Sequence, residues 1–80
     1  MIVTAEISYY PMTTSFDQPI DLFLKKLEQE NIEVKVGTMS TLLTGEYKIV
    51  MDILTNSMRE LMEDYPSVFT IKISNSCVIK

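Results

Sequence analysis

The chain has 80 residues, of which 46% are hydrophobic and 22% are charged, and this balance is typical of one small globular domain spanning residues 1–80. A core of this size gives modest stability, so we expect the protein to associate with copies of itself. Seven Lys and Arg residues against eleven Asp and Glu residues give a net charge of −4, which argues against nucleic acid as a partner.

A strand and then a helix are predicted in the first part of the chain. In Ile2–Tyr10, apolar residues occupy every second position, which is the period of a half-buried strand. Apolar residues then recur at helical spacing and predict a helix from Asp17, the preferred N-cap, to about Glu30. A capping box formed by Ser15 and Gln18 is the alternative start of this helix.

A hairpin, a second helix and a final strand are predicted in the rest of the chain. Ile32–Val36 and Met39–Thr44 read as two strands joined by a short turn near Gly37. The uninterrupted segment from Glu46 to about Asp64 predicts the longest helix, which carries more apolar surface than one sheet face covers. Part of that surface is expected to contact another chain. Alternation over Val68–Ser74 predicts the last strand.

The order βαββαβ favours a single compact topology. Right-handed crossovers lead to a four-stranded antiparallel sheet in the order 4-1-3-2, with both helices on one face. This α+β architecture is the ferredoxin-like plait. The residues expected to face the helices are Val3, Ala5, Ile7, Val34, Val36, Met39, Leu43, Phe69, Ile71 and Ile73. The opposite face is expected to carry Thr4, Glu6, Ser8, Lys35, Ser40, Leu42, Thr70, Lys72 and Ser74.

The residue inventory argues against catalysis and metal binding. The chain has no histidine, which removes the commonest general base, the usual nucleophile activator and most transition-metal sites. The single cysteine, Cys77, is interpreted as an ordinary free thiol, with a ligand contact as the alternative. No leader pattern and no run near the roughly 20 apolar residues of a membrane span is present. We therefore expect a cytoplasmic protein that is not an enzyme, needs no cofactor and does not insert into membranes.

Two polar residues are informative because of their positions. Glu6, in a central strand, either pairs with Lys72 on the neighbouring strand or accepts hydrogen bonds from a ligand, and the two roles can coexist. Thr41 is expected to point toward the helices, where its hydroxyl either bonds to nearby backbone or lines a pocket. Tyr9, Tyr10 and Tyr47 either stack on a flat heterocycle or serve as ordinary packing.

Three segments, read in chain order, resemble a known family. They are Ile7–Met12 (ISYYPM), Val36–Gly45 (VGTMSTLLTG) and Ile73–Cys77 (ISNSC). On a βαββαβ frame they resemble the YkoF-like family of thiamine- and hydroxymethylpyrimidine-binding proteins. The resemblance implies non-enzymatic binding of thiamine or its hydroxymethylpyrimidine moiety in support of vitamin B1 precursor uptake or salvage. It also suggests a functional link to a thiamine transporter.

The resemblance also suggests where a ligand would lie and how many chains are needed. Better-known members carry two such repeats in one chain, so we expect a homodimer or homotetramer of this single repeat. The expected ligand-binding residues are Glu6, Ser8, Tyr10, Thr38, Met39, Ser40, Thr41, Asn75 and Ser76. The first two segments meet at one end of the sheet and the Asn75 segment ends at the other. Either some of these residues are structural or a second chain completes the site.

A second interpretation of the function stays open. The chain could be a small oligomeric regulatory or interaction plait that associates through its sheet or its second helix and binds another metabolite or a protein. Loss of a ligand response in Glu6→Gln and Thr41→Val with the assembly intact would favour the vitamin-binding interpretation. An enzyme that uses Cys77 is the least favoured alternative, because no other residue supports a turnover.

Overall fold

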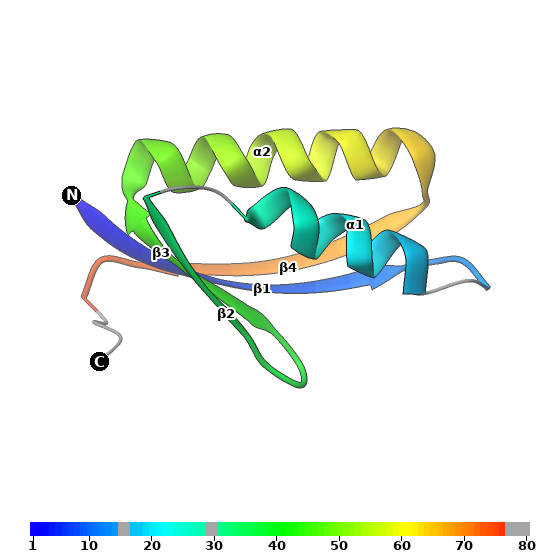
Figure 1. The fold of residues 1–80 in the computed structure, drawn as a ribbon, viewed down its shortest axis with the longest axis horizontal. Helices are drawn as coiled ribbons and strands as arrows, with labels where there is room; N and C mark the ends of the chain where they lie inside the picture. The colour runs from blue at the N-terminus through cyan, green and yellow to red at the C-terminus, as the bar shows by residue number, and fades with distance from the viewer. Residues whose placement is uncertain (15–16, 29–30, 77–80) are drawn as a thin grey trace.

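The computed structural model describes residues 1–14, 17–28 and 31–76 and confirms the predicted βαββαβ order. Its elements are β1 (Ile2–Pro11), α1 (Asp17–Leu27), β2 (Ile32–Val36), β3 (Thr41–Glu46), α2 (Tyr47–Asp64) and β4 (Ser67–Ser74). The sheet is antiparallel throughout and has the order β2-β3-β1-β4, which confirms the ferredoxin-like plait. Both helices lie on one face of the sheet, and the other face, called the open face below, is left uncovered (Figure 1).

Helix α1 ends earlier than predicted, at Leu27 instead of about Glu30. The backbone N–H of Glu28 donates to the carbonyl of Lys25, a bond across three residues that tightens the last turn. Asn31 follows with a φ of 69°, the left-handed conformation that lets the chain reverse into β2. The alternative helix start at Ser15 lies outside the described residues.

Strand β3 begins at Thr41, two residues later than predicted. The N–H of Gly37 donates to the carbonyl of Ser40 at 2.9 Å, which leaves Thr38 and Met39 as the two-residue loop of the β2–β3 hairpin. An ideal Cβ on Gly37 would come within 2.9 Å of the Ser40 carbonyl oxygen, so this tight closure favours glycine. Met39 is therefore a turn residue.

The core lies between the sheet and the two helices. Its buried hydrophobic residues are Val3, Ala5, Ile7, Phe23, Leu27, Leu43, Val50, Leu54 and Leu61. Three residues predicted to face the helices are instead exposed: Val36 (61%), Met39 (85%) and Ile73 (42%). Val36 and Ile73 lie on the two edge strands and Met39 lies in the hairpin turn, where the helices do not cover them.

Helix α2 packs on the sheet and is tied to α1 by a surface ion pair. The Lys26 ammonium donates to Glu60 at 2.9 Å, and this contact lowers the pKa of the Glu60 carboxyl below its ordinary value of 4.5. The predicted surplus of apolar surface on α2 is seen at Met62, which is 52% exposed. Within the described part of the chain, neither helix is long and apolar enough to cross a bilayer.

Candidate functional site

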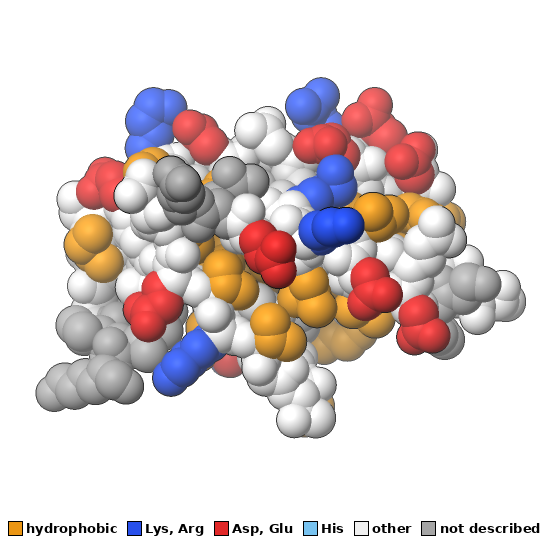
Figure 2. Space-filling view, in the orientation of Figure 1, with side chains coloured by type: hydrophobic (Ala, Val, Ile, Leu, Met, Phe, Trp, Pro, Cys, Tyr) orange, Lys and Arg blue, Asp and Glu red, His pale blue; other side chains and the backbone are white. Residues whose placement is uncertain are grey.

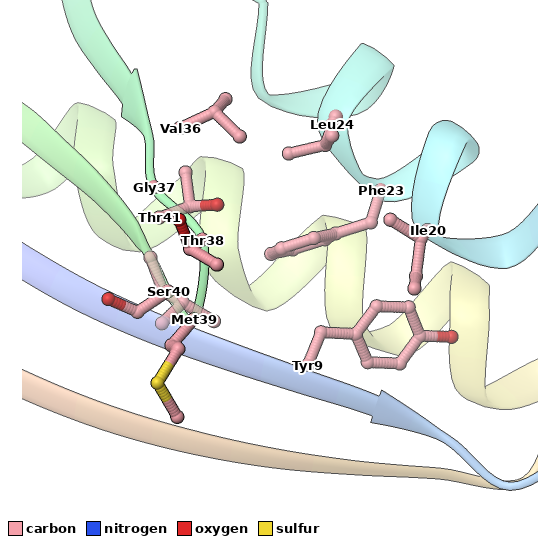
Figure 3. Close-up of a pocket in the computed structure, with 11 residues that line it drawn as sticks. Tyr9, Ile20, Phe23, Leu24, Val36, Gly37, Thr38, Met39, Ser40 and Thr41 are labelled. Carbon is pink, nitrogen blue, oxygen red and sulfur yellow. The ribbon is translucent and has the colours of Figure 1, made fainter. Parts of the chain in front are cut away.

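A pocket of about 140 Å³ lies on the helix side of the sheet, where α1 passes the β2–β3 hairpin (Figure 3). We call it the hairpin pocket; it is lined by Ile7, Tyr9, Ile20, Phe23, Leu24, Val36, Gly37, Thr38, Met39, Ser40 and Thr41. Three elements far apart in sequence therefore form it: the end of β1, one face of α1, and the hairpin turn. Figure 2 shows hydrophobic side chains gathered where α1 meets the hairpin, as expected of an apolar hollow.

Aromatic rings form one wall of the hairpin pocket. Phe23 projects from α1 toward the hairpin, and Tyr9 rises from β1 beside it (Figure 3). The Tyr9 ring lies edge-on to Phe23 at 5.2 Å and stacks on Phe69 at 4.5 Å with an interplanar angle of 6°. The hydroxyls of Tyr9 and Ser67 share a hydrogen bond of 3.0 Å, which holds the phenol in place. The Tyr9 ring is therefore held in a fixed position in the wall of the pocket.

Thr41 supplies a buried polar group to this pocket. The residue is 6% exposed and lines the hollow from the first position of β3, so its predicted orientation toward the helices is confirmed. Among the described residues, no hydrogen-bond partner of the Thr41 hydroxyl is found. Every side-chain oxygen of these residues that is completely buried has a partner, so the Thr41 hydroxyl keeps some contact with solvent. The hydroxyl is thus available to a molecule that enters the pocket.

Glu6 and Ser8 lie on the open face of the sheet. They form hydrogen bonds to the hairpin turn, which is one wall of the pocket. Ser40 donates to Oε2 of Glu6 at 3.1 Å, and Ser8 donates to the carbonyl of Met39 at 3.3 Å. In Figure 3 the side chains of Met39 and Ser40 point away from the cavity. The side chains of Glu6 and Ser8 therefore hold the hairpin turn from the open face. The opposite side of the same turn lines the pocket.

The predicted ion pair of Glu6 is confirmed. Glu6 and Lys72 are register partners across β1 and β4, and the Lys72 ammonium lies 3.8 Å from Oε1 of Glu6. The Lys72 side chain is 80% exposed and that of Glu6 is 43% exposed, so solvent screens the pair and it contributes little to stability. A second hollow of about 260 Å³ lies beside it on the open face and is lined by Thr4, Glu6, Leu42, Lys72, Ile73 and Ser74.

The other predicted ligand-binding residues do not reach the hairpin pocket. Tyr10 is 48% exposed and, by strand alternation from Tyr9, belongs to the open face. Asn75 and Ser76 lie at the opposite end of the sheet, where Asn75 donates to the sulfur of Met1 at 3.7 Å. Cys77 lies outside the described residues. The structure thus brings together Thr38, Met39, Ser40 and Thr41, with the side chains of Met39 and Ser40 turned outward.

Sequence reasoning did not select the contribution of α1 to this pocket. The helical spacing of Ile20, Phe23 and Leu24 is typical of core residues, and Phe23 is indeed almost fully buried. The apolar residues of α1 would show the same helical spacing if their side chains filled a core or if they lined a hollow. No signal in the helix sequence distinguishes these two cases.

The tether between Glu6 and Ser40 can be tested by stability measurements. We expect Glu6→Ala to lower the free energy of unfolding by about 1 kcal/mol, because Ser40 loses a charged acceptor. Glu6→Gln keeps an acceptor oxygen and should cost clearly less. In urea unfolding, the losses in Glu6→Ala and Ser40→Ala should be non-additive in the double variant, and simple additivity would show that the two side chains do not interact.

The fold and the pocket define a ferredoxin-like plait with an aromatic-walled hollow between α1 and a tethered hairpin. The chain belongs to the family of thiamine-binding proteins, whose family model matches residues 5–76. The family resemblance drawn from the three sequence segments is thereby confirmed. No protein of curated function matches the chain.

Solved structures show the same fold. A protein from Streptococcus pneumoniae superimposes with a TM-score of 0.86 at 20% identity, covering 98% of this chain and 90% of that one. A Thermotoga maritima protein assigned provisionally to thiamine biosynthesis or salvage gives 0.84 at 23% identity, with 95% and 85% covered. A hypothetical protein from Methanocaldococcus jannascii gives 0.83 at 18% identity, with 99% and 84% covered. At these identities the likeness establishes the fold.

Proposed function

We propose that this chain binds thiamine, or its hydroxymethylpyrimidine moiety, in the hairpin pocket and leaves it chemically unchanged. In this proposal the protein works in the cytoplasm and supports the uptake or salvage of vitamin B1 precursors. Membership in the thiamine-binding family supports the class of ligand. The observation that carries the choice of pocket is the buried Thr41 hydroxyl, which opens into a hollow with a preorganised aromatic wall.

The size of the pocket favours one ring of the ligand. Its volume is about 140 Å³, and an apolar protein cavity of about 150 Å³ holds a benzene molecule. A pyrimidine therefore fits, whereas the two rings of thiamine together do not. The pyrimidine would lie against Tyr9 and Phe23, and the thiazolium ring would extend past the hairpin turn toward solvent, where the acidic protein attracts its positive charge.

The chemistry of the lining favours an unphosphorylated pyrimidine. A hydroxyl such as that of Thr41 can donate to a ring nitrogen or accept from the exocyclic amino group. None of the described residues that line the pocket carries a charge at neutral pH. A phosphate group is held in proteins by Arg, Lys or convergent N–H donors, so this lining offers it no charged partner.

The same lining supports binding without turnover. General acid–base chemistry needs a side chain that can exchange a proton near neutral pH, within reach of the reacting atom. The chain contains no histidine. Glu6, whose carboxylate accepts a hydrogen bond from Ser40 of the hairpin, faces the open side of the sheet. In this proposal the pocket therefore binds the ligand through its shape and its hydrogen bonds and releases it chemically unchanged.

A thermal-shift titration tests this function. At a free ligand concentration of about 100 times Kd, thiamine or hydroxymethylpyrimidine should stabilise the fold by about 2.7 kcal/mol. Thr41→Val should weaken binding about tenfold, because it removes one hydrogen bond and keeps the shape. Thr41→Ser retains the hydroxyl and serves as the matched control. Unchanged melting with both ligands up to their solubility limits would refute the proposal, and equal binding of hydroxymethylpyrimidine phosphate would refute the preference for the unphosphorylated ring.

A further inference from the structure

Helix α2 meets α1 along one of its flanks. Glu60 accepts a hydrogen bond from Lys26 of α1 at 2.9 Å, so the flank that carries Glu60 faces α1. Side chains two residues apart on an α-helix differ by about 200° in direction, so Met58 and Met62 project from the flank opposite Glu60. This side of the helix, called the methionine flank below, comprises Tyr47, Met51, Thr55, Met58 and Met62.

The methionine flank is exposed and is shaped to receive a side chain. Met62 is 52% exposed and Tyr47 is 42% exposed. An open hollow of about 470 Å³ lies along the flank and is lined by Thr55, Met58, Arg59, Met62 and Glu63. The first four of these residues have the spacing i, i+3, i+4 and i+7, and four residues so placed form the hole for one inserted side chain when two helices pack. The flank therefore fits a second helix.

Four charged residues form a rim beside the methionine flank. Lys48, Asp52, Arg59 and Glu63 fall within a sector of about 60° next to it, because each residue turns the helix by about 100°. Their signs alternate along the chain, from Lys48 at the start of α2 to Glu63 near its end. A helix that runs in the opposite direction with the same four charges therefore opposes every positive charge with a negative one.

The charges of α2 are only partly compensated within one chain. Lys48 donates to Asp52 at 3.1 Å, whereas neither Arg59 nor Glu63 forms an ion pair with a described residue. The first turn of the helix holds no acidic residue and the last turn no basic one, so the terminal charges of Lys48 and Asp64 add to the helix dipole instead of opposing it. A neighbour of opposite polarity would stabilise both ends.

We infer that a second copy of this chain packs its α2 antiparallel against the methionine flank, about a twofold axis between residues 55 and 56. In this register Lys48 faces the partner's Glu63, and Asp52 faces the partner's Arg59. The twofold axis repeats both contacts, so four pairs of opposite charge lie along the interface. The antiparallel direction also brings the negative end of each helix dipole to the positive end of the other.

The apolar side chains agree with the same register. The partner's Met51 comes to lie opposite residue 60, midway between Met58 and Met62, where the hollow lies. Methionine is unbranched and polarisable, so it fills an irregular gap of this kind. A parallel arrangement would place each charge of the rim at the level of the same charge on the partner. The position of the hollow and the order of the charges thus select the same antiparallel pair.

A second copy fits this surface better than other partners do. The net charge of −4 disfavours a nucleic acid or an anionic membrane surface. A helix that matches the whole rim needs the same four charges in the reverse direction, and α2 of a second copy supplies them. None of the described residues that line the hairpin pocket belongs to α2, so this pairing and the proposed function can fail independently.

A cysteine cross-link tests the contact. Thr55 is exposed and lies beside the twofold axis, so a cysteine there faces its own copy within the Cα separation of about 4.4–6.8 Å that a disulfide spans. The control is Asp21→Cys/Cys77→Ser, whose cysteine is exposed on α1. With copper phenanthroline as the oxidant, Thr55→Cys/Cys77→Ser should form a disulfide-linked dimer about tenfold faster than this control, because association concentrates its thiols. Equal rates in the two variants would overturn the inference.

Charge reversal tests the register. At protein concentrations below the dissociation constant of the pair, Lys48→Glu should slow the cross-linking of Thr55→Cys/Cys77→Ser about tenfold, because two cross-helix pairs become repulsive. Glu63→Lys should have the same effect, and Lys48→Glu/Glu63→Lys should restore the original rate. Asp21→Lys makes a charge change of equal size on α1 and should leave the rate unchanged.

The charge variants are expected to fold, because the substituted positions are exposed. The double variant also places a negative charge near the start of α2 and a positive charge near its end, which the helix dipole favours. Circular dichroism checks the fold of each variant. A double variant as slow as the single variants, or single variants as fast as the parent, would contradict the antiparallel pairing.

Discussion

Replacing Phe23 with alanine is expected to lower the free energy of unfolding by about 3–5 kcal/mol. Phe23 is 2% exposed and lies edge-on to both Tyr9 and Phe69, with ring centroids 5.2 and 5.7 Å apart. Its removal enlarges the hairpin pocket into a cavity and takes away two ring contacts at once. A domain of 80 residues is stabilised by about 4–12 kcal/mol in total, so this single change is a large part of it.

Urea unfolding followed by circular dichroism measures this loss. Leu22→Ala, on the same helix at a position that is 36% exposed, is the control and should cost far less. Phe23→Leu keeps most of the volume and removes the aromatic face, so it should stay folded while binding thiamine more weakly. Tolerated exchanges between hydrophobic residues cost less than about 1.5 kcal/mol. If Phe23→Ala lowers the free energy of unfolding by less than this, the ring is not part of the packed core.

Replacing Leu24 with tryptophan is expected to abolish ligand-induced stabilisation. Leu24 is half-buried and lines the hairpin pocket from α1, so a larger side chain at this position extends into a hollow of about 140 Å³. The stabilisation of about 2.7 kcal/mol at about 100 times Kd should then disappear. The fold should persist, because the added indole occupies space that is already open.

Leu22→Trp is the matched control for this blocking variant. Leu22 lies two residues away on the same helix and lines a different hollow, the one between α1 and α2 that also includes Lys26 and Glu60. Its tryptophan should leave ligand-induced stabilisation intact. Equal stabilisation by thiamine in Leu24→Trp and Leu22→Trp would show that the ligand binds outside the hairpin pocket, with the open-face hollow beside Glu6 as the next location to test.

The comparison between sequence and structure is clearest at Glu6. The alternating pattern of β1 indicates that Glu6 faces away from the helices, and the predicted pairing with Lys72 is confirmed. The pattern contains no information on Ser40, which is distant along the chain and reaches Glu6 only because the hairpin turn folds over β1. Glu6, which is predicted to bind the ligand, thus also holds the hairpin turn through Ser40.

Edge positions show a second limit of pattern reasoning. Val36, Met39 and Ile73 have the apolar character of core residues, and all three are exposed. Periodicity assigns a face to each residue, but burial also needs a neighbouring element that covers that face. Coverage depends on the lengths and placement of α1 and α2, which are tertiary properties.

The sequence by itself determined the order of the elements, the strand topology and the face to which Thr41 belongs. These follow from local periods of two and 3.6 residues and from the handedness of crossovers, which are properties of short segments. Only the tertiary structure decided that Phe23, Tyr9 and Thr41 surround one hollow and that Asn75 lies at the far end of the sheet. A pocket is a gap left by side chains from distant segments, so its walls exist only after those segments have packed together.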